Sequence, residues 1–217
     1  AFPEVIVYGS THCQEILQRP NAKVLMKKLG TAARDLYRPD SKEEIPVDDL
    51  AVDIALKDGD MVSLGNETIQ AIEAKGHTDC SMAYALEPDG ILFTSESTGI
   101  VEAGLAINTP ILKSFADAMT SLEKCRGYGA KYICLPHFGL IPQDFNEEYW
   151  MQFQQGCEDR IQMVREMKKE GLDADQMLER YRDRYWDPIM EQEQPIEAFL
   201  INAKNIIKAA LRALDEK

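Results

Sequence analysis

The sequence predicts a mixed α/β (α+β) fold with a separate helical part at its C-terminal end. Up to about Gly139, short runs rich in β-branched and aromatic residues alternate with turns. Beyond that point, apolar residues recur every three or four positions, which is typical of amphipathic helices. The 217 residues, 45% of them hydrophobic, are enough to bury a substantial core. We therefore expect an α/β domain over residues 1–140 and a helical extension over residues 141–217, packed on that domain or on a second subunit.

The strands are predicted from short apolar or alternating runs that are bounded by turn residues. The predicted strands cover residues 5–8, 51–56, 61–64, 68–74, 81–86, 91–94 and 132–135. Residues 87–90 read Glu-Pro-Asp-Gly and form a hairpin loop, with Pro and Gly at positions that a turn favours. Residues 38–49, which contain two prolines and mixed charges, are expected to form a surface loop.

Helices are predicted from apolar periodicity and from capping residues. They cover residues 13–19, 21–36, 109–126, 146–170, 174–186 and 195–214. Ser10 or Thr11 caps the first helix, and Asp173 caps the helix over residues 174–186. Thr109 is the expected cap of another helix because Pro110 follows it, at the position where a helix tolerates proline best.

The last predicted helix has one continuous apolar stripe. Its members are Ile196, Phe199, Leu200, Ala203, Ile206, Ile207, Ala210, Leu211 and Leu214. Packing against the rest of the same chain is one explanation of this stripe, and a subunit interface is the other. Gly171 and Pro188 are expected to break the helical part. We expect a homodimer or a larger assembly.

The composition excludes several classes of function. Thirty-seven acidic residues against 24 basic residues give a net charge of −13, whereas a nucleic-acid-binding protein needs a basic face. The apolar runs are too short to cross a bilayer, and the first residues do not resemble a signal peptide. Five cysteines, an odd number without a C-x-x-C pair, are typical of a reducing compartment. We therefore expect a cytoplasmic protein with a small-molecule substrate and no membrane partner.

Three polar residues follow three predicted strands in the order histidine, acid, histidine. His77, Glu96 and His137 each lie just past a strand end, beside Gly, Ser or Pro. Strand ends at one edge of a layered sheet can direct ligands into one cleft, and imidazole and carboxylate groups bind metal ions. A single histidine of this kind is more often an ordinary loop residue. The ordered set of three predicts a metal site.

The segments around these residues resemble the later motifs of the metallo-β-lactamase-fold hydrolases. Residues 76–78, Gly-His-Thr, resemble the family's G-H-T motif, whose histidine binds one metal. Residues 92–96, Leu-Phe-Thr-Ser-Glu, resemble L-F-T-G-D, whose aspartate bridges two metals. His137 resembles the strand-end histidine of the second metal. The resemblance covers roughly residues 1–140 and implies the second part of an αββα sandwich.

The resemblance also implies a function. It implies a metal-dependent hydrolase of a small ester, thioester or lactone, with two divalent metal ions that activate water. Zinc is the preferred metal, and iron or manganese are the alternatives. His77 and His137 are the implied ligands, and Glu96 is the implied bridge. Behind these ligands, Asp79 either orients an imidazole or is a simple turn carboxylate, and Cys80 either faces the site or is a buried structural cysteine.

The sequence also departs from the family pattern. The H-x-H-x-D-H motif is absent, Glu96 stands where the family has Asp, and Ser95 replaces Gly. In the family that motif precedes a segment resembling residues 2–8, so its position would lie before residue 1. We therefore expect an N-terminally truncated chain whose metal site is incomplete and which is inactive alone.

Two other functions remain open from the sequence. One is a di-iron oxidoreductase on the same fold, and the other is a metal-free scaffold whose helices bind a partner. No G-x-S-x-G segment identifies a nucleophile, so the sequence assigns no catalytic residue beyond the metal ligands. Three aromatic residues after the His137 loop either line a substrate pocket or pack in the core: Tyr149, Trp150 and Phe153.

Overall fold

The computed structural model describes residues 5–187 and 194–215. The chain divides into two compact units, Ala1–Asp58 and Gly59–Lys217, which we call the N-terminal unit and the C-terminal unit. The predicted change from strands to helices near residue 140 therefore falls inside the C-terminal unit. Each unit is described by itself.

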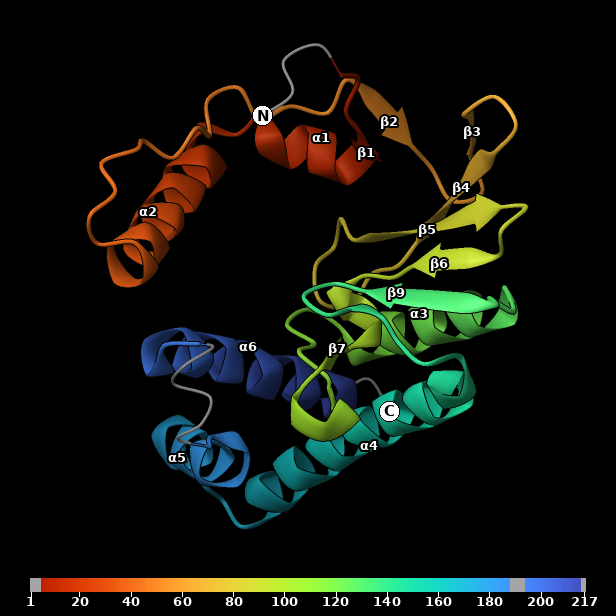
Figure 1. The fold of residues 1–217 in the computed structure, drawn as a ribbon. Helices are drawn as coiled ribbons and strands as arrows, with labels where there is room; N and C mark the ends of the chain where they lie inside the picture. Colours follow the sequence, from red (N-terminus) through yellow and green to blue (C-terminus); the bar gives the residue numbers. More distant parts are fainter. Residues whose placement is uncertain (1–4, 188–193, 216–217) are drawn as a thin grey trace. The chain divides into compact units, whose positions relative to one another are not determined.

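The N-terminal unit contains two strands and two helices (Figure 1). In chain order they are β1 (Tyr8–Ser10), α1 (Thr11–Leu17), α2 (Pro20–Tyr37) and β2 (Ile54–Leu56). The two strands pair in parallel. The Oγ atom of Ser10 accepts a hydrogen bond from the backbone N–H of Cys13 at 3.1 Å, which confirms Ser10 as the cap of α1. Neither α1 nor α2 has a buried residue.

The C-terminal unit is built on a six-stranded sheet with the order β10-β9-β6-β5-β4-β3. Its strands are β3 (Met61–Ser63), β4 (Thr68–Glu73), β5 (Met82–Glu87), β6 (Ile91–Phe93), β9 (Tyr132–Leu135) and β10 (Gly139–Leu140). All neighbours pair antiparallel except β6 and β9, which are parallel. Parallel strands need a crossover connection, and helix α3 (Phe115–Gly127) supplies it here. A two-stranded ribbon of β7 (Ile100–Val101) and β8 (Ile107–Asn108) precedes α3.

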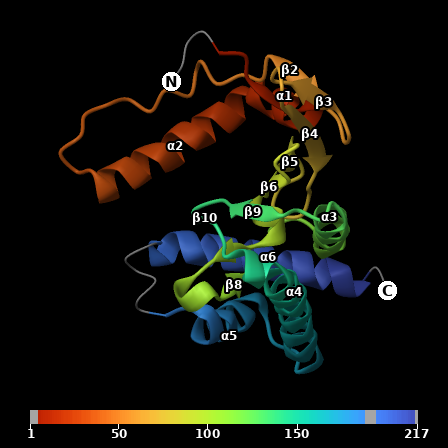
Figure 2. The same ribbon diagram turned by 45° about the vertical axis from the view of Figure 1, so that its right-hand side comes forward.

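Three helices follow the sheet: α4 (Asn146–Lys169), α5 (Ala174–Tyr185) and α6 (Ile196–Asp215). In Figures 1 and 2, α4 and α6 cross one another and α5 lies against α6. Asp173 caps α5 through the backbone N–H groups of Asp175 and Gln176, as predicted. The break predicted at Pro188 lies outside the described residues.

One hydrophobic core joins the sheet to the helices. Strand residues such as Leu92 and Ile133 share it with Phe115 of α3 and with Phe153 of α4. The apolar stripe of α6 joins this core as well, because its members Phe199, Ala203, Ile206, Ile207 and Ala210 are buried. The stripe therefore packs against its own chain, the first of the two explanations. Tyr149, Trp150 and Phe153 are at most 3% exposed, so they are core residues and do not line a pocket.

The predicted start of the third helix, just after Thr109, is wrong. The helix starts at Phe115, and the Oγ atom of Ser114 accepts from the backbone N–H of Asp117 at 3.1 Å. The backbone N–H groups of Lys113 and Ser114 instead bond to the carbonyl oxygen of Gly76, so residues 109–114 form a non-helical link before the helix. The cap at Ser114 satisfies the backbone N–H of Asp117, which has no partner within the first turn of the helix.

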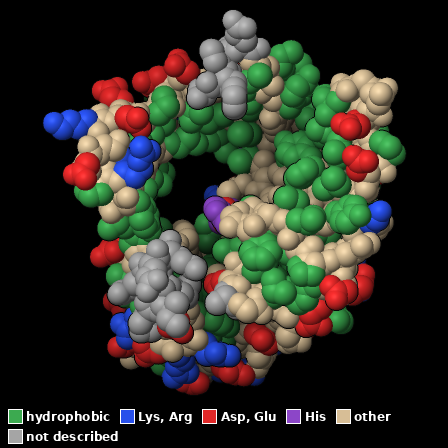
Figure 3. Space-filling model, viewed as in Figure 1, with side chains coloured by type: hydrophobic (Ala, Val, Ile, Leu, Met, Phe, Trp, Pro, Cys, Tyr) green, Lys and Arg blue, Asp and Glu red, His purple; other side chains and the backbone are tan. Residues whose placement is uncertain are grey.

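Charged side chains gather over the helical part of the C-terminal unit. In the space-filling view, acidic and basic groups lie over α5 and the adjoining end of α4, whereas the surface over β5 and β6 is mostly hydrophobic or uncharged (Figure 3). The interleaved charges of these helices therefore face solvent. Within residues 5–187 and 194–215, no helix has the length and apolar character needed to cross a membrane.

Candidate metal centre

The loop after β4 places His77 with a defined orientation. The Nδ1 atom of His77 lies 2.6 Å from the carbonyl oxygen of Pro110. Because a carbonyl oxygen can only accept, Nδ1 carries a hydrogen, and Nε2 is the ring nitrogen available to a ligand. The backbone N–H of His77 donates to the Oγ atom of Ser97 at 3.0 Å. Together these contacts fix the direction in which the imidazole ring points, as a metal-binding histidine requires.

A short 3₁₀ helix carries Glu96 toward this imidazole. The helix covers Glu96–Thr98, and the Oγ atom of Ser95 caps it by accepting from the backbone N–H of Ser97 at 3.3 Å. One carboxylate oxygen of Glu96, Oε2, lies 3.5 Å from the Nε2 atom of His77. Serine at position 95 therefore has a structural role here, since its hydroxyl satisfies a helix-terminal N–H group.

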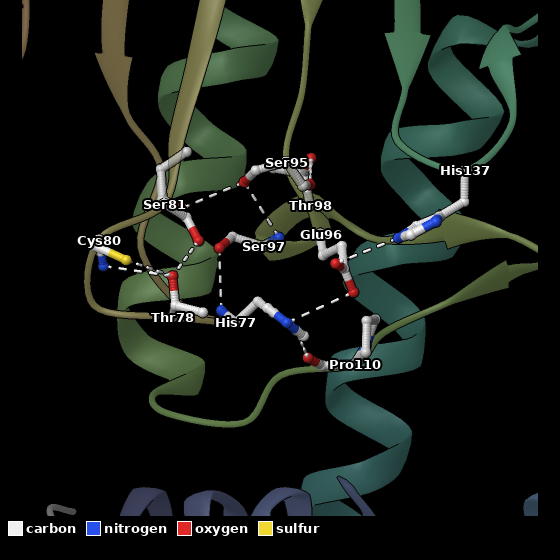
Figure 4. A network of polar contacts seen from close by, with 11 residues as sticks. His77, Thr78, Cys80, Ser81, Ser95, Glu96, Ser97, Thr98, Pro110 and His137 are labelled. Carbon is white, nitrogen blue, oxygen red and sulfur yellow. Dashed lines mark hydrogen bonds and ion pairs between the residues drawn. The ribbon is translucent and has the colours of Figure 1, made fainter. Parts of the chain in front are cut away.

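The loop between β9 and β10 brings His137 to the other oxygen of the same carboxylate. The Nε2 atom of His137 lies 3.4 Å from the Oε1 atom of Glu96. In Figure 4, Glu96 points between the two imidazoles. His137 has a φ of +64°, in the left-handed region that residues other than glycine seldom adopt. Such backbone strain is concentrated at functional sites.

The three residues predicted from the sequence therefore meet at one place. The side chains of His77, Glu96 and His137 are 17%, 32% and 67% exposed, so solvent reaches the cluster mainly from the His137 side. Within the described residues, no group of three or more His, Cys, Asp or Glu side chains is arranged to hold a single metal ion. Each imidazole instead faces a different oxygen of Glu96.

Of the two residues expected behind the ligands, Asp79 does not orient the imidazole of His77. The Oδ2 atom of Asp79 lies 3.4 Å from the Nζ atom of Lys113, and the acceptor for His77 is the carbonyl of Pro110. The Sγ atom of Cys80 lies 3.4 Å from the Oγ1 atom of Thr78. Asp79 is thus a turn carboxylate paired with a lysine, and Cys80 is half-buried beside a threonine.

A cavity of about 840 Å³ opens beside the cluster, within the C-terminal unit. Glu96, Pro110 and His137 form part of its wall. Further wall residues come from the helical part: Arg160, Tyr181, Tyr185, Phe199 and Ile206. The cavity is large enough for a small organic substrate, and its wall combines apolar and aromatic side chains with polar and charged ones.

Three contributors to this site were not predicted. Ser97 and Pro110 act through long-range contacts with His77, which leave no local pattern in the sequence. Arg160 does leave one. It occupies a position on the buried stripe of α4, between Cys157 and Val164, where a charged residue is unexpected.

The fold matches known structures. No sequence profile of a known protein family matches the chain. A metallo-β-lactamase family protein from Thermus thermophilus superposes with a TM-score of 0.59 at 16% identity, covering 97% of this chain and 66% of that chain. A β-lactamase domain protein from Burkholderia ambifaria superposes with a TM-score of 0.54 at 17% identity, covering 88% of this chain and 55% of that one. The chain therefore has the metallo-β-lactamase fold.

A rubredoxin oxygen:oxidoreductase from Desulfovibrio gigas also matches, with a TM-score of 0.42 at 15% identity, over 75% of this chain and 45% of that chain. So low a TM-score carries no argument about function. The chain spans between about half and two thirds of the two metallo-β-lactamase-fold structures above.

Proposed function

We propose that the protein is a metal-dependent hydrolase of a small ester, thioester or lactone, with His77, Glu96 and His137 as ligands of divalent metal ions. One observation carries the proposal. The Nε2 atoms of two imidazoles face the two oxygens of a single carboxylate, at 3.5 and 3.4 Å. The fold, which metal-binding proteins share, supports the same assignment.

The arrangement calls for positive charge between the groups. His77 donates through Nδ1, so in the neutral imidazole the Nε2 lone pair faces the lone pairs of the Glu96 carboxylate. Two acceptors facing each other repel unless a proton or a metal ion lies between them. Two ligands bound tetrahedrally to zinc at about 2.0–2.1 Å lie about 3.3 Å apart. The distances of 3.5 and 3.4 Å between the imidazole Nε2 atoms and the Glu96 oxygens are close to this value. Each imidazole and its carboxylate oxygen are therefore spaced as neighbouring ligands of one ion.

Glu96 fits the role of a bridge. Its two oxygens face different imidazoles, so His77 with Oε2 and His137 with Oε1 form two ligand pairs. When bound, divalent ions of this kind lower the pKa of a coordinated water toward neutrality and polarise a carbonyl oxygen. The chain's own residues hold His77 in place through Pro110 and Ser97, and the adjoining cavity accommodates the substrate.

The test is zinc binding by the 217-residue chain. Metal-free chain is titrated with Zn²⁺ in competition with a zinc indicator, and the variants His77→Ala, Glu96→Gln and His137→Ala are compared with it. Each variant should weaken zinc binding by about tenfold or more, because each loses one of few ligands. His12→Ala is the matched control, since His12 lies on α1 in the N-terminal unit and faces Glu15. Its zinc affinity should be unchanged.

Hydrolysis is then measured in the protein as its gene encodes it, loaded with zinc. An activated acetate ester and an acyl thioester serve as probes. Unchanged zinc affinity in all three ligand variants would contradict the proposed centre. Oxygen consumption by an iron-loaded protein without hydrolysis would favour the oxidoreductase, and a protein that binds no metal and turns over no substrate would favour a scaffold.

A further inference from the structure

Arg160 is a buried cation in the wall of the cavity that holds Glu96 and His137. It lies on α4, is 6% exposed, and contributes to the cavity lining. A charged side chain is rarely buried to this degree unless it is paired with an opposite charge. The contacts of Arg160 therefore show whether a negative group of the protein balances its charge.

None of the contacts of Arg160 is with a carboxylate. Its Nε atom donates to the hydroxyl of Tyr181 at 3.0 Å, Nη1 donates to the carbonyl of Gly156 at 3.2 Å, and Nη2 donates to the Oδ1 atom of Asn108 at 2.6 Å. The guanidinium carbon lies 4.5 Å from the ring centre of Tyr185. Within residues 5–187 and 194–215, the hydrogen-bond acceptors of Arg160 are thus a phenol, a backbone carbonyl and a side-chain amide, and none is a carboxylate.

The neighbouring acidic groups do not supply a negative charge either. Burial raises the pKa of the Cys157 thiol to about 12, so this thiol is neutral near pH 7. Burial also raises the pKa of Tyr181, whose phenol is likewise neutral. Asn108, which accepts from Arg160, also donates through its Nδ2 atom to Glu102 at 2.7 Å. Among the described residues, no group that hydrogen-bonds directly to Arg160 carries a negative charge.

Some N–H groups of Arg160 make no hydrogen bond to the described residues. A guanidinium group has five N–H donors, and the contacts above use three of them. Within the part of the chain that the structure describes, Nη1 and Nη2 each make one hydrogen bond, which leaves one N–H group on each. One available donor on each terminal nitrogen is what two oxygens of a carboxylate or phosphate require for bidentate binding.

We propose that Arg160 binds an anionic end of the substrate, and that the substrate is a small acyl ester or thioester with a terminal carboxylate. This inference rests on the proposed function, because it takes the cavity to be the substrate site of a hydrolase. The scissile carbonyl lies toward Glu96 and His137, and the carboxylate pairs with Arg160. The apolar body of the substrate contacts Phe199 and Ile206.

The charges around the cavity favour a carboxylate over a phosphate group. Arg160 offers a single positive charge, and the cavity wall also contains Glu96 and Glu102. The whole chain carries a net charge of −13. One carboxylate matches the single cation, whereas a dianionic phosphate group would place two negative charges at the same contact.

The test uses the 217-residue chain and glutarate, a small dicarboxylate, as the probe. In the unsubstituted chain, adding glutarate should shift the NMR resonance of the Arg160 Nε–H group, a measurement that needs no variant. Glutarate affinity is also measured by calorimetry. Arg160→Met should weaken it by about tenfold or more, since a charge-assisted bidentate contact is lost. Arg160→Lys should weaken it less, because the charge remains.

Arg165→Met is the matched control. Arg165 lies on the same helix and contacts Gln162 of that helix, so glutarate affinity should be unchanged. Far-ultraviolet circular dichroism and thermal unfolding show whether each variant is folded. Equal glutarate affinity in folded Arg160→Met, no Arg160 shift in the unsubstituted chain, or tighter binding of inorganic phosphate than of glutarate would overturn the proposal. Zinc titration of the same variants separates this failure from a failure of the metal centre, because Arg160 is not a proposed ligand.

Discussion

Tyr149 supports the 3₁₀ helix that carries Glu96. Its hydroxyl lies 2.7 Å from the carbonyl oxygen of Thr98 and 2.9 Å from the Oγ1 atom of Thr98. The hydroxyl of Thr98 itself donates to the carbonyl of Ser95 at 3.1 Å. Tyr149 is fully buried, and burial raises the pKa of its phenol, so it remains a neutral donor. The 3₁₀ helix that carries Glu96 is therefore attached to α4 through one phenol.

Tyr149→Phe should destabilise the protein without creating a cavity. The substitution removes the donor for the buried Thr98 carbonyl, and an unsatisfied buried acceptor costs about 1–3 kcal/mol. The free energy of unfolding in urea should fall by this amount, and zinc affinity should fall because Glu96 is less firmly held. Tyr132→Phe, at a half-buried strand position, is the control and should change stability little. Equal losses in the two variants would contradict the role given to Tyr149.

Residues of the candidate site were predictable where a strand end marks them. His77, Glu96 and His137 each follow a strand, so their order along the chain indicates a common place in space. Pro110 was not predictable, because its contribution is a backbone carbonyl 33 positions away from His77. Arg160 could have been found from the sequence, since a cation within an apolar helical stripe contradicts the pattern around it.

At the scale of elements, the loop after β4 is fixed against the start of α3. The carbonyl of Gly76 accepts from the backbone N–H groups of Lys113 and Ser114 at 3.0 and 3.3 Å. Gly76 has a φ of +139°, and a Cβ atom there would lie 2.7 Å from the Cβ atom of Ala118. Only glycine permits this backbone and this close approach. The element contact thereby sets the position of His77.

Gly76→Ala should displace the loop from α3. Strain at this φ together with the clash on Ala118 should lower the free energy of unfolding by about 2 kcal/mol or more. Zinc affinity should fall in the same variant, because His77 moves with the loop. The matched control is Gly129→Ala, where φ is +72° and a Cβ atom would meet nothing within 4 Å. That control should lose only about 1 kcal/mol and keep its zinc affinity. A Gly76 variant indistinguishable from it would refute the close approach.

Elements were predictable in proportion to their length and to the clarity of their caps. The capping box at Asp173 and the long apolar stripe of α6 specify their helices locally. The strands β7, β8 and β10 have two residues each, too few for a periodicity to show. The start of α3 was misplaced because Thr109-Pro110 is also a good local start signal. The tertiary hydrogen bonds to Gly76 decide between the two starts.

At the scale of the whole molecule, the mixed α/β fold was predictable and the division into units was not. Apolar periodicity shows that α4 and α6 each have a face to bury, but it does not show what covers that face. In the structure both helices share the core of the sheet, so the strand-to-helix change does not separate two units. The boundary lies between Asp58 and Gly59, in a polar turn that periodicity does not distinguish from other turns.

The number of ligands among the described residues limits how tightly the chain binds metal. Protein-bound zinc normally takes three or four protein ligands, whereas bridging by Glu96 gives two described donors to each ion, one imidazole and one carboxylate oxygen. We therefore expect the 217-residue chain to bind zinc reversibly and to retain less than one equivalent after gel filtration in metal-free buffer. Inductively coupled plasma mass spectrometry of the eluted protein measures this directly. Retention of two equivalents per chain would mean that further residues of this chain act as ligands, and the proposed ligand set would then be incomplete.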